Sequence, residues 1–328
     1  MRWLVALLAA GRVGALAVAN PGATNQQKSG IGNTLANLNA ELLAKKEASI
    51  VGRDSGGVGA LRTAPLSVVR DKGGTLARLI EREGCVGLKG ALSPETAARL
   101  KRFVDEELER SKEAVTAGAE PFEGRFGGVN CRGAGTFGSR ADLYLPFDGV
   151  VRRAMAELCE SLAPLLDALV GPDAAIHEIS SLVADPGSPR QCVHADTIVL
   201  PCPQYPDAVM APLYTLFVAL QDVEDGMGHT LFLPETHSDH TLWNVRRSDQ
   251  ERYVATRRAA QSSLKTGDVA LFDSRCLHAG LGNDSAKRRT LFYCTLSRQA
   301  EWPLPGGLHG SNSLRAQDRR RWTLRDLP

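Results

Sequence analysis

Residues 267–296 read GDVALFDSRCLHAGLGNDSAKRRTLFYCTL and contain two short apolar runs, at 269–272 and 290–296. Glycine, aspartate and serine stand before and between these runs, and short apolar runs bounded by such turn-forming residues are typical of β-strands. The stretch therefore predicts two strands separated by a turn-rich connection. It also carries His278, at the end of the strand that begins at 267–268, and Arg289, at the start of the second strand.

The same pattern extends back to residue 174, where glycine, proline and aspartate separate further apolar runs. It predicts additional strands at 176–183, 192–199, 213–223 and 230–233. Several short strands with turn signals between them favour an all-β barrel or jelly roll.

Helices are expected before these strands. Ser93-Pro94-Glu95 begins one, because serine is a preferred N-cap residue and proline fits the first helical position. Weaker signals predict a helix at 75–82, a strand at 85–88, a glycine-rich loop at 120–136 and a helix at 150–170 that Pro164 is expected to kink. The predicted fold is mainly β with flanking helices: a double-stranded β-helix (jelly roll, cupin-like) core buttressed by N-terminal helices.

The composition is that of an ordinary globular protein, with 43% hydrophobic and 23% charged residues in a chain of 328. A net charge of +2 indicates no dominant electrostatic partner, and the arginine cluster near the C-terminus lacks the interleaved aromatic residues of a nucleic-acid site. We therefore expect no nucleic-acid partner. The seven cysteines are dispersed without a Cys-x-x-Cys pair, which argues against a disulfide framework or a zinc ribbon.

The two ends of the chain differ in character from its middle. Residues 1–19 have the form of a signal or targeting segment, with Arg2 before apolar residues and a small-x-small cleavage pattern at 17–19. Arg12 interrupts the apolar run, so no stable membrane span is expected. We predict a low-complexity linker at 20–73, a folded domain at 74–300 and a basic tail at 301–328. Cleavage of residues 1–19 would place the protein in the secretory pathway or an organelle; otherwise it is expected in the cytoplasm.

Three residues have the chemistry of a metal site. His194 and Asp196 are two apart in an expected strand, and alternate residues of a strand share one face. A jelly roll can return His278 to their side. Two imidazoles and one carboxylate are the protein ligands of non-haem ferrous sites, which leave positions open for chemistry. Arg289, directed into the barrel, would require an anionic partner, and a carboxylate matches its planar fork.

Together with the motifs around them, these residues resemble the iron(II)- and 2-oxoglutarate-dependent oxygenases, and within them the phytanoyl-CoA dioxygenase-like family. The resemblance covers about residues 74–297. Its motifs are DPGS at 185–188, QCVHAD at 191–196, ALQD at 219–222, LPETH at 233–237 and GDV at 267–269, followed by His278, Asn283 and Arg289.

The resemblance implies a cofactor set and a reaction. His194, Asp196 and His278 would bind Fe2+, and Arg289 would hold the distal carboxylate of 2-oxoglutarate. Dioxygen is the second co-substrate, with ascorbate as a supporting reductant. A small-molecule or lipid substrate would be hydroxylated while 2-oxoglutarate is converted to succinate and CO2. Related halogenases lack the carboxylate that Asp196 supplies here, which favours hydroxylation.

Several positions depart from the family pattern. Phe217 stands where some members place a tryptophan that lines the co-substrate pocket, and Gly280 where some place a serine that contacts the distal carboxylate. Glu235 replaces a glycine often found in the Pro-Gly-Thr-His turn. The remaining histidines of this region, His229, His237 and His240, are expected to be structural.

The substrate side is marked only by a glycine-rich segment, 124–138, which with the following strand is expected to roof the pocket. Arg140 and Tyr144 are the candidate substrate contacts there, and nothing marks a coenzyme A site. Two other classes remain open. One is a non-catalytic jelly-roll metal-binding or structural protein. The other is a tetrahedral zinc site made by Cys192, His194, Cys276 and His278.

Overall fold

The computed structural model describes residues 58–128, 138–201, 206–207, 209–240, 252–298 and 322–327. The predicted targeting segment at 1–19 lies outside the described residues, as do most of the expected linker and most of the basic tail. Within the described residues, no helix has the length and apolar character needed to cross a membrane.

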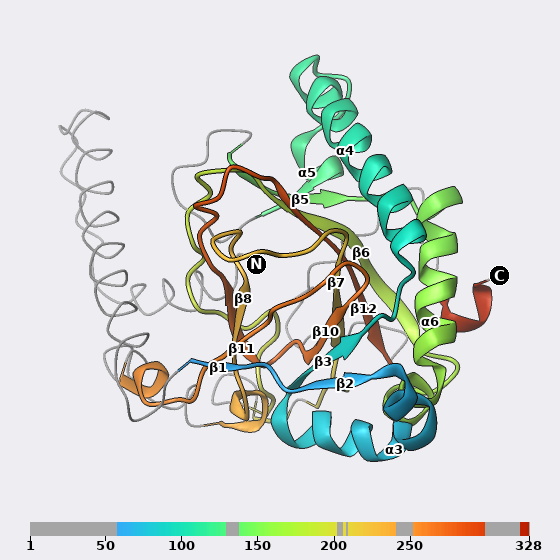
Figure 1. Cartoon of the computed structure of the whole chain (residues 1–328), viewed down its shortest axis with the longest axis vertical. Helices are drawn as coiled ribbons and strands as arrows, with labels where there is room; N and C mark the ends of the chain where they lie inside the picture. The colour runs from blue at the N-terminus through green and yellow to red at the C-terminus, as the bar shows by residue number, and fades with distance from the viewer. Residues whose placement is uncertain are drawn as a thin grey trace.

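Two β-sheets face each other and form the core of the fold (Figure 1). The large sheet has the order β2 (Thr63–Pro65), β3 (Cys85–Lys89), β10 (Val269–Asp273), β7 (Tyr214–Ala219), β12 (Arg289–Ser297), β6 (Ala175–Ala184), β5 (Arg140–Tyr144) and β4 (Phe126–Gly127), with β13 (Trp322–Thr323) also paired to β6. The small sheet has the order β1 (Gly59–Ala60), β9 (Ala260–Gln261), β8 (Thr230–Leu233) and β11 (Leu277–Gly280). This arrangement confirms the predicted mainly-β class with a jelly-roll core.

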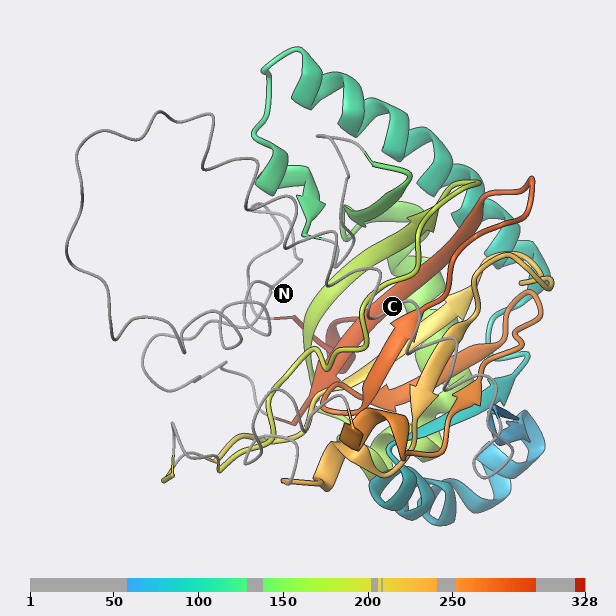
Figure 2. The same ribbon diagram turned by 90° about the vertical axis from the view of Figure 1, so that its left-hand side faces the viewer.

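The helices cover the outer face of the large sheet, on the side away from the small sheet (Figures 1 and 2). They are α3 (Leu66–Glu83), α4 (Pro94–Thr116), the short α5 (Phe122–Arg125) and α6 (Gly149–Leu169). Ser93 caps α4 as predicted, since its hydroxyl accepts a hydrogen bond from the Thr96 amide at 3.2 Å. Pro164 lies inside α6 without ending it, and Gly73 of α3 packs directly on the Pro164 backbone, where a Cβ would not fit.

Alternation along the strands divides the apolar residues into two layers. Leu216, Val218, Leu271 and Phe292 belong to the layer under the helices. The intervening positions, such as Phe217, Phe272 and Leu291, belong to a second cluster between the two sheets. The second cluster forms the inner face of the jelly roll and surrounds the candidate site.

Several sequence predictions about elements were wrong, and the expected loop at 120–136 contains α5 and β4. Ordered structure begins before residue 74, because β1, β2 and the first half of α3 lie within 58–73, where Leu61, Ala64 and Val69 are buried. The Gly73-Gly74 pair interrupts the apolar repeat of α3 and hides its beginning. The segment 192–199 is not a strand: its ladder contact is a single bridge at His194, and the backbone amides of Asp196 and Thr197 both donate to the Ser274 carbonyl.

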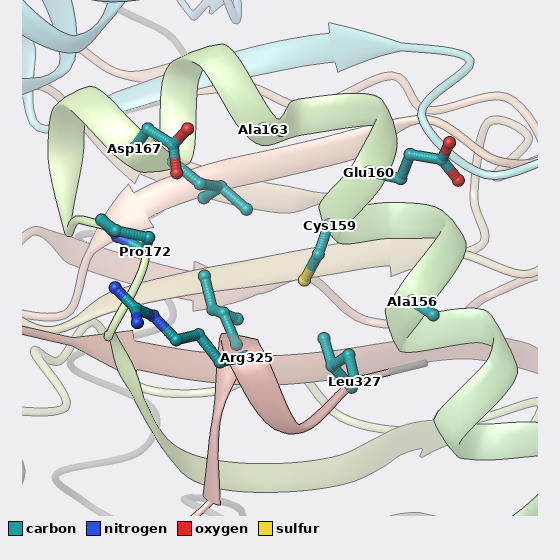
Figure 3. Close-up of a pocket in the computed structure, with 10 residues that line it drawn as sticks. Ala156, Cys159, Glu160, Ala163, Asp167, Pro172, Arg325 and Leu327 are labelled. Atoms are coloured by element: carbon teal, nitrogen blue, oxygen red, sulfur yellow. The ribbon is translucent and has the colours of Figure 1, made fainter.

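The C-terminal residues 322–327 are part of the fold rather than of a tail. Trp322 of β13 packs edge-on against Phe147, with ring centroids 4.8 Å apart. The chain then runs along α6, and a shallow pocket lies between them, lined by Cys159 of α6 and by Arg325 and Leu327 (Figure 3).

Candidate metal centre

His194 and His278 lie opposite each other in an isolated antiparallel bridge. The His194 amide donates to the His278 carbonyl at 2.9 Å, and the His278 amide donates to the His194 carbonyl at 2.8 Å. The sequence had placed His278 at the end of the strand that begins at 267–268. In the structure His278 lies on a separate strand, β11. Because two backbone hydrogen bonds join the residues, both imidazoles leave the same point of the small sheet, and their ring centroids are 4.5 Å apart.

Each ring is oriented by the same local contact. Nδ1 of His194 lies 2.7 Å from the Cys192 carbonyl oxygen, and Nδ1 of His278 lies 3.0 Å from that of Cys276. A proton on Nδ1 satisfies both contacts and leaves Nε2 as the lone-pair donor, the usual arrangement of metal-binding histidines. Both Nε2 atoms face the Asp196 carboxylate, each at 3.7 Å.

The three ligand atoms form a set that fits a divalent metal. They lie within 4.8 Å of one another, and His194, Asp196 and His278 are the one such group found among the described residues. Burial and the neighbouring His278 lower the pKa of His194 to about 4, and burial lowers the pKa of His278 to about 4. Both rings are therefore neutral at neutral pH, as metal ligation requires. Burial also raises the pKa of Asp196.

Neither Cys192 nor Cys276 belongs to the cluster of ligand atoms found among the described residues. Cys192 is exposed, whereas Cys276 is buried and its Sγ lies 3.3 Å from the Leu233 carbonyl oxygen. Their contribution is made by their backbone carbonyls, which orient the histidines. The geometry therefore does not support the tetrahedral zinc site of two cysteines and two histidines.

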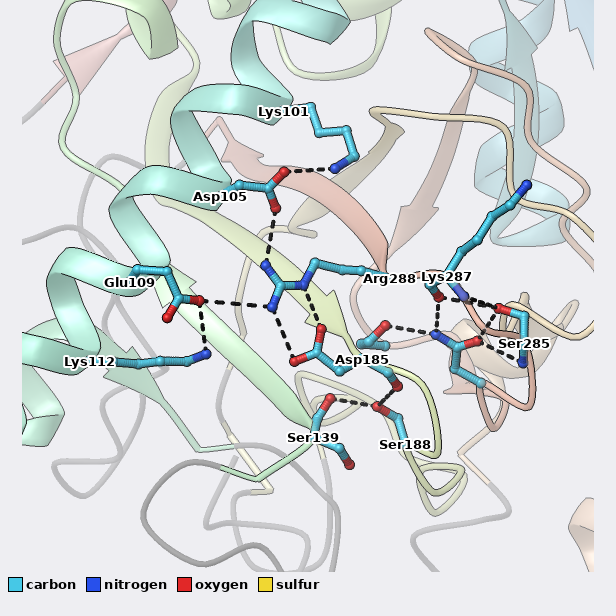
Figure 4. Close-up of polar contacts among 12 residues, drawn as sticks. Lys101, Asp105, Glu109, Lys112, Ser139, Asp185, Ser188, Ser285, Lys287 and Arg288 are labelled. Carbon is cyan, nitrogen blue, oxygen red and sulfur yellow. Dashed lines mark hydrogen bonds and ion pairs between the residues drawn. The ribbon is translucent and has the colours of Figure 1, made fainter.

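Arg289 is buried on the inner face of β12, and Arg288 points to the opposite side. Arg289 is 1% exposed, and its Nη1 donates to the Gly228 carbonyl. Gly228 has a φ of 79°, and any Cβ there would collide with the Leu281 carbonyl, so glycine is required beside the arginine. Arg288 instead reaches Asp185 and, at 3.3 Å, Asp105 of α4 (Figure 4). The expected alternation of the two arginines is observed.

Phe217 lies on the inner face of β7, near His278. Its ring is 4.9 Å from Phe272, 5.8 Å from Tyr293 and 6.2 Å from the His278 ring, measured between centroids. Phe272 is itself 4.8 Å from His278. An aromatic wall therefore borders one side of the metal centre.

Gly280 is explained by its neighbours. A Cβ at Gly280 would lie 2.7 Å from Gln191 Oε1 and 2.9 Å from Arg140 Nη1. Gln191 Oε1 accepts from the Gly280 amide at 3.0 Å, and Arg140 Nη2 donates to the Leu281 carbonyl at 2.8 Å. These two side chains from outside the small sheet occupy the space that a serine would need. The sequence signal for Gln191, its place in the motif before His194, was seen but given no role.

The other predicted site residues are also located. Arg140 is buried on β5, and Tyr144, half-buried at the end of the same strand, has its ring beside Gly127. Two inner-face residues were missed from the sequence: Asp142 of β5 and Tyr293 of β12, which are hydrogen-bonded to each other. Neither lies in a recognisable motif, because only the register of the sheet brings them together.

The remaining histidines make structural contacts. His237 Nε2 lies 2.8 Å from the Glu81 carbonyl oxygen, and His240 Nδ1 lies 3.2 Å from that of Pro201. His229 lies 3.4 Å from Asp225. Glu235 has a φ of 70°, in the left-handed region, which accounts for a glycine being common at this turn in related sequences.

Several solved structures have a similar fold, and two of them are named as a carbocyclase and an epimerase. AviO1 from Streptomyces viridochromogenes Tue57 is 19% identical with a TM-score of 0.50, covering 70% of this chain and 97% of that one. The non-heme alpha-ketoglutarate-dependent carbocyclase SnoK from nogalamycin biosynthesis is 17% identical with a TM-score of 0.52, covering 79% and 96%. The epimerase SnoN, in complex with Fe3+, alpha-ketoglutarate and nogalamycin RO, is 18% identical with a TM-score of 0.50, covering 79% and 99%.

No curated protein matches the chain. A family model does, and it matches residues 80–291, which is more than half of the chain and includes His194, Asp196, His278 and Arg289. The chain belongs to the phytanoyl-CoA dioxygenase (PhyH) family.

Proposed function

We propose that the protein is an iron(II)- and 2-oxoglutarate-dependent dioxygenase that hydroxylates a small-molecule or lipid substrate. The observation that carries the proposal is the convergence of two neutral imidazoles and one carboxylate beside a buried arginine on the facing sheet. Membership of the PhyH family supports it. Iron and 2-oxoglutarate, when bound with dioxygen, supply the oxidation of a substrate C–H bond, with succinate and CO2 as the other products.

The donor set matches ferrous iron better than the alternatives. Three protein ligands on one face leave the remaining positions for a chelating co-substrate and dioxygen. The convergence of both Nε2 atoms on the Asp196 carboxylate, each at 3.7 Å, supports a metal site over a purely structural role for these residues. Zinc ligation by the cysteines is not supported, because the one ligand cluster found among the described residues contains neither thiol.

The chain's own residues would bind and shield the reactants. Arg289 offers a guanidinium in a buried position, where a carboxylate of 2-oxoglutarate would neutralise it. Phe217, Phe232 and Phe272 surround His278 and limit the access of water. Arg140 lies over Gly280, two residues from His278, and Tyr144 lies at the end of the same β5 strand. We place both at the border of the substrate site.

The test begins without substrate. Anaerobic protein titrated with Fe(II) and 2-oxoglutarate should develop a weak visible charge-transfer band, and with air and ascorbate it should form succinate. Asp196→Ala and His194→Ala should abolish both signals. His240→Ala is the matched control, because His240 is exposed and contacts a loop carbonyl, and it should retain both.

Two outcomes would contradict the proposal. The first is well-folded protein that shows no band with both ligands. The second is turnover that persists in Asp196→Ala. The type of reaction needs its own test, because two structural neighbours are named as a carbocyclase and an epimerase. Hydroxylation predicts a product with one oxygen atom more than the organic substrate.

A further inference from the structure

The inner face of the large sheet carries an acid that the metal centre does not use. Asp142 of β5 pairs with Leu182 of β6, which pairs in turn with Leu291 of β12. Directly paired residues share a face of a sheet, and Leu291 belongs to the cluster between the two sheets. Asp142 therefore points into the jelly roll, where it is 6% exposed.

The carboxyl group is held by a built environment. The Tyr293 hydroxyl donates to Asp142 Oδ1 at 3.0 Å. Ser180, directly across the ladder from Tyr293, is close enough for its hydroxyl to affect the pKa of both groups. On the other side, Gly127 of β4 faces Asp142, and a Cβ at Gly127 would overlap Oδ2. Glycine at this edge leaves room for the carboxyl group.

The Asp142–Tyr293 pair borders the metal centre but is displaced from the co-substrate anchor. The Tyr293 ring lies 5.8 Å from Phe217, which lies 6.2 Å from His278. Arg289 is on the same face of β12 but four residues earlier, roughly 13 Å along the strand. The pair is thus placed to meet a molecule that lies beside the metal rather than against Arg289.

We propose that Asp142 and Tyr293 recognise a hydroxyl group of the organic substrate and so orient the neighbouring C–H bond at the metal centre. This inference rests on the proposed function and names the class of its substrate, an alcohol or polyol. Tyr293 occupies one acceptor site of the carboxyl group, and a carboxylate has several more. A substrate O–H can donate to one of these remaining positions.

A hydroxyl group suits this carboxyl group in either protonation state. Burial raises the pKa of Asp142 to about 7, partly offset by the Tyr293 hydrogen bond. An ammonium group would need the carboxylate fully ionised in a buried position. A hydroxyl group binds without that requirement, because it can donate to the carboxylate and can accept from the protonated acid.

The experiment compares three soluble probes of one shape: cyclohexanol, cyclohexanone and cyclohexylamine. Each is titrated at pH 8 into anaerobic protein loaded with Fe(II) and 2-oxoglutarate, and the change in the visible band gives the dissociation constant. We expect cyclohexanol to bind about fivefold more tightly than cyclohexanone, the value of one net hydrogen bond. Tyr293→Phe and Asp142→Asn should each reduce this preference, while the 2-oxoglutarate titration stays unchanged.

Tyr214→Phe is the matched control, since Tyr214 is buried on the opposite face of β7 and should keep the alcohol preference. Equal binding of alcohol and ketone by the wild-type protein would overturn the inference, as would tighter binding of the amine. Weaker 2-oxoglutarate binding in Tyr293→Phe would reassign the pair to the co-substrate. Each of these three outcomes requires that the visible band of the Fe(II)–2-oxoglutarate complex is present. Absence of that band in the wild-type protein would instead contradict the proposed function.

Discussion

The two walls of the site are built by different means. On the small sheet, His194 and His278 are joined by two backbone hydrogen bonds, and each ring is oriented by the carbonyl two residues before it. On the large sheet, Arg289, Tyr293 and Asp142 come from strands whose pairing alone brings them to one face. The first wall depends on local backbone geometry and the second on register across the whole sheet.

This difference decides what a substitution can disturb. A change on the large sheet can remove a binding group without moving the histidines, because no ligand of the metal centre belongs to that sheet. The metal centre should therefore still bind iron after a substitution that removes a binding group from the large sheet. Arg289, the first residue of β12, and Arg288 just before it allow this to be tested.

Arg289→Leu should give the largest effect. It removes the buried guanidinium, and we expect the dissociation constant of 2-oxoglutarate to rise about a hundredfold, because truncating one partner of a buried charged pair is costly. Arg288→Leu is the matched change one residue away on the outer face, where the side chain pairs with Asp185 and Asp105. It should leave co-substrate binding unchanged and lower the free energy of unfolding by about 1 kcal/mol or less.

The measurement is the anaerobic titration with 2-oxoglutarate, with Fe(II) binding followed separately in its absence. If the two substitutions weakened 2-oxoglutarate binding equally, the site would depend on the pairing register of β12 rather than on the Arg289 guanidinium. Loss of Fe(II) binding in Arg289→Leu would break the proposed independence of the two walls.

The same contrast explains what could be predicted from the sequence. The His-x-Asp pair, the later histidine and the arginine were recognisable because, with the motifs around them, they follow the order and spacing of a known family. The strand assigned to 192–199 was wrong, since the apolar pattern there does not reveal that Asp196 and Thr197 bond to the Ser274 carbonyl. Asp142 and Tyr293 were missed because their contact spans β5 and β12, and no local pattern encodes that register.

Gly280→Ser should have a moderate effect, and it probes the point where the two walls meet. Gly280 lies on β11, but Gln191 and Arg140 fill the space beside it. We expect the serine to displace one of them and to weaken 2-oxoglutarate binding by about tenfold, since overpacking a buried site costs about 1–3 kcal/mol. Gly282→Ser is the control, because a Cβ there meets its nearest neighbour at an ordinary 3.4 Å.

Isothermal titration of the metal-loaded proteins with 2-oxoglutarate distinguishes these two variants. Adding Gln191→Ala to Gly280→Ser should restore much of the lost affinity by making room. Tighter binding in Gly280→Ser alone would mean that the serine gains the hydrogen bond seen at this place in related enzymes, and that Arg140 and Gln191 move without cost.

The last comparison concerns stability rather than binding, and it is a change in the pH dependence of unfolding. The folded-state pKa of Asp142 is raised to about 7, mainly by burial, so the folded protein binds a proton that the unfolded chain releases near its ordinary value of about 3.9. More protons bound in the folded state means that this group makes stability fall as pH rises, from about 4 up to about 7. Asp142→Asn removes that contribution.

The measurement is the free energy of unfolding by urea of metal-free wild-type protein and Asp142→Asn, at pH 5, 6, 7 and 8. The difference between the two proteins should shift in favour of the variant up to about pH 7 and then level off. Taking the difference cancels the contributions of His194 and His278, whose lowered pKa values act in the opposite direction. A difference that does not vary with pH would mean that Asp142 is ionised in the folded protein, and that the large-sheet wall presents a fixed negative charge to its ligand.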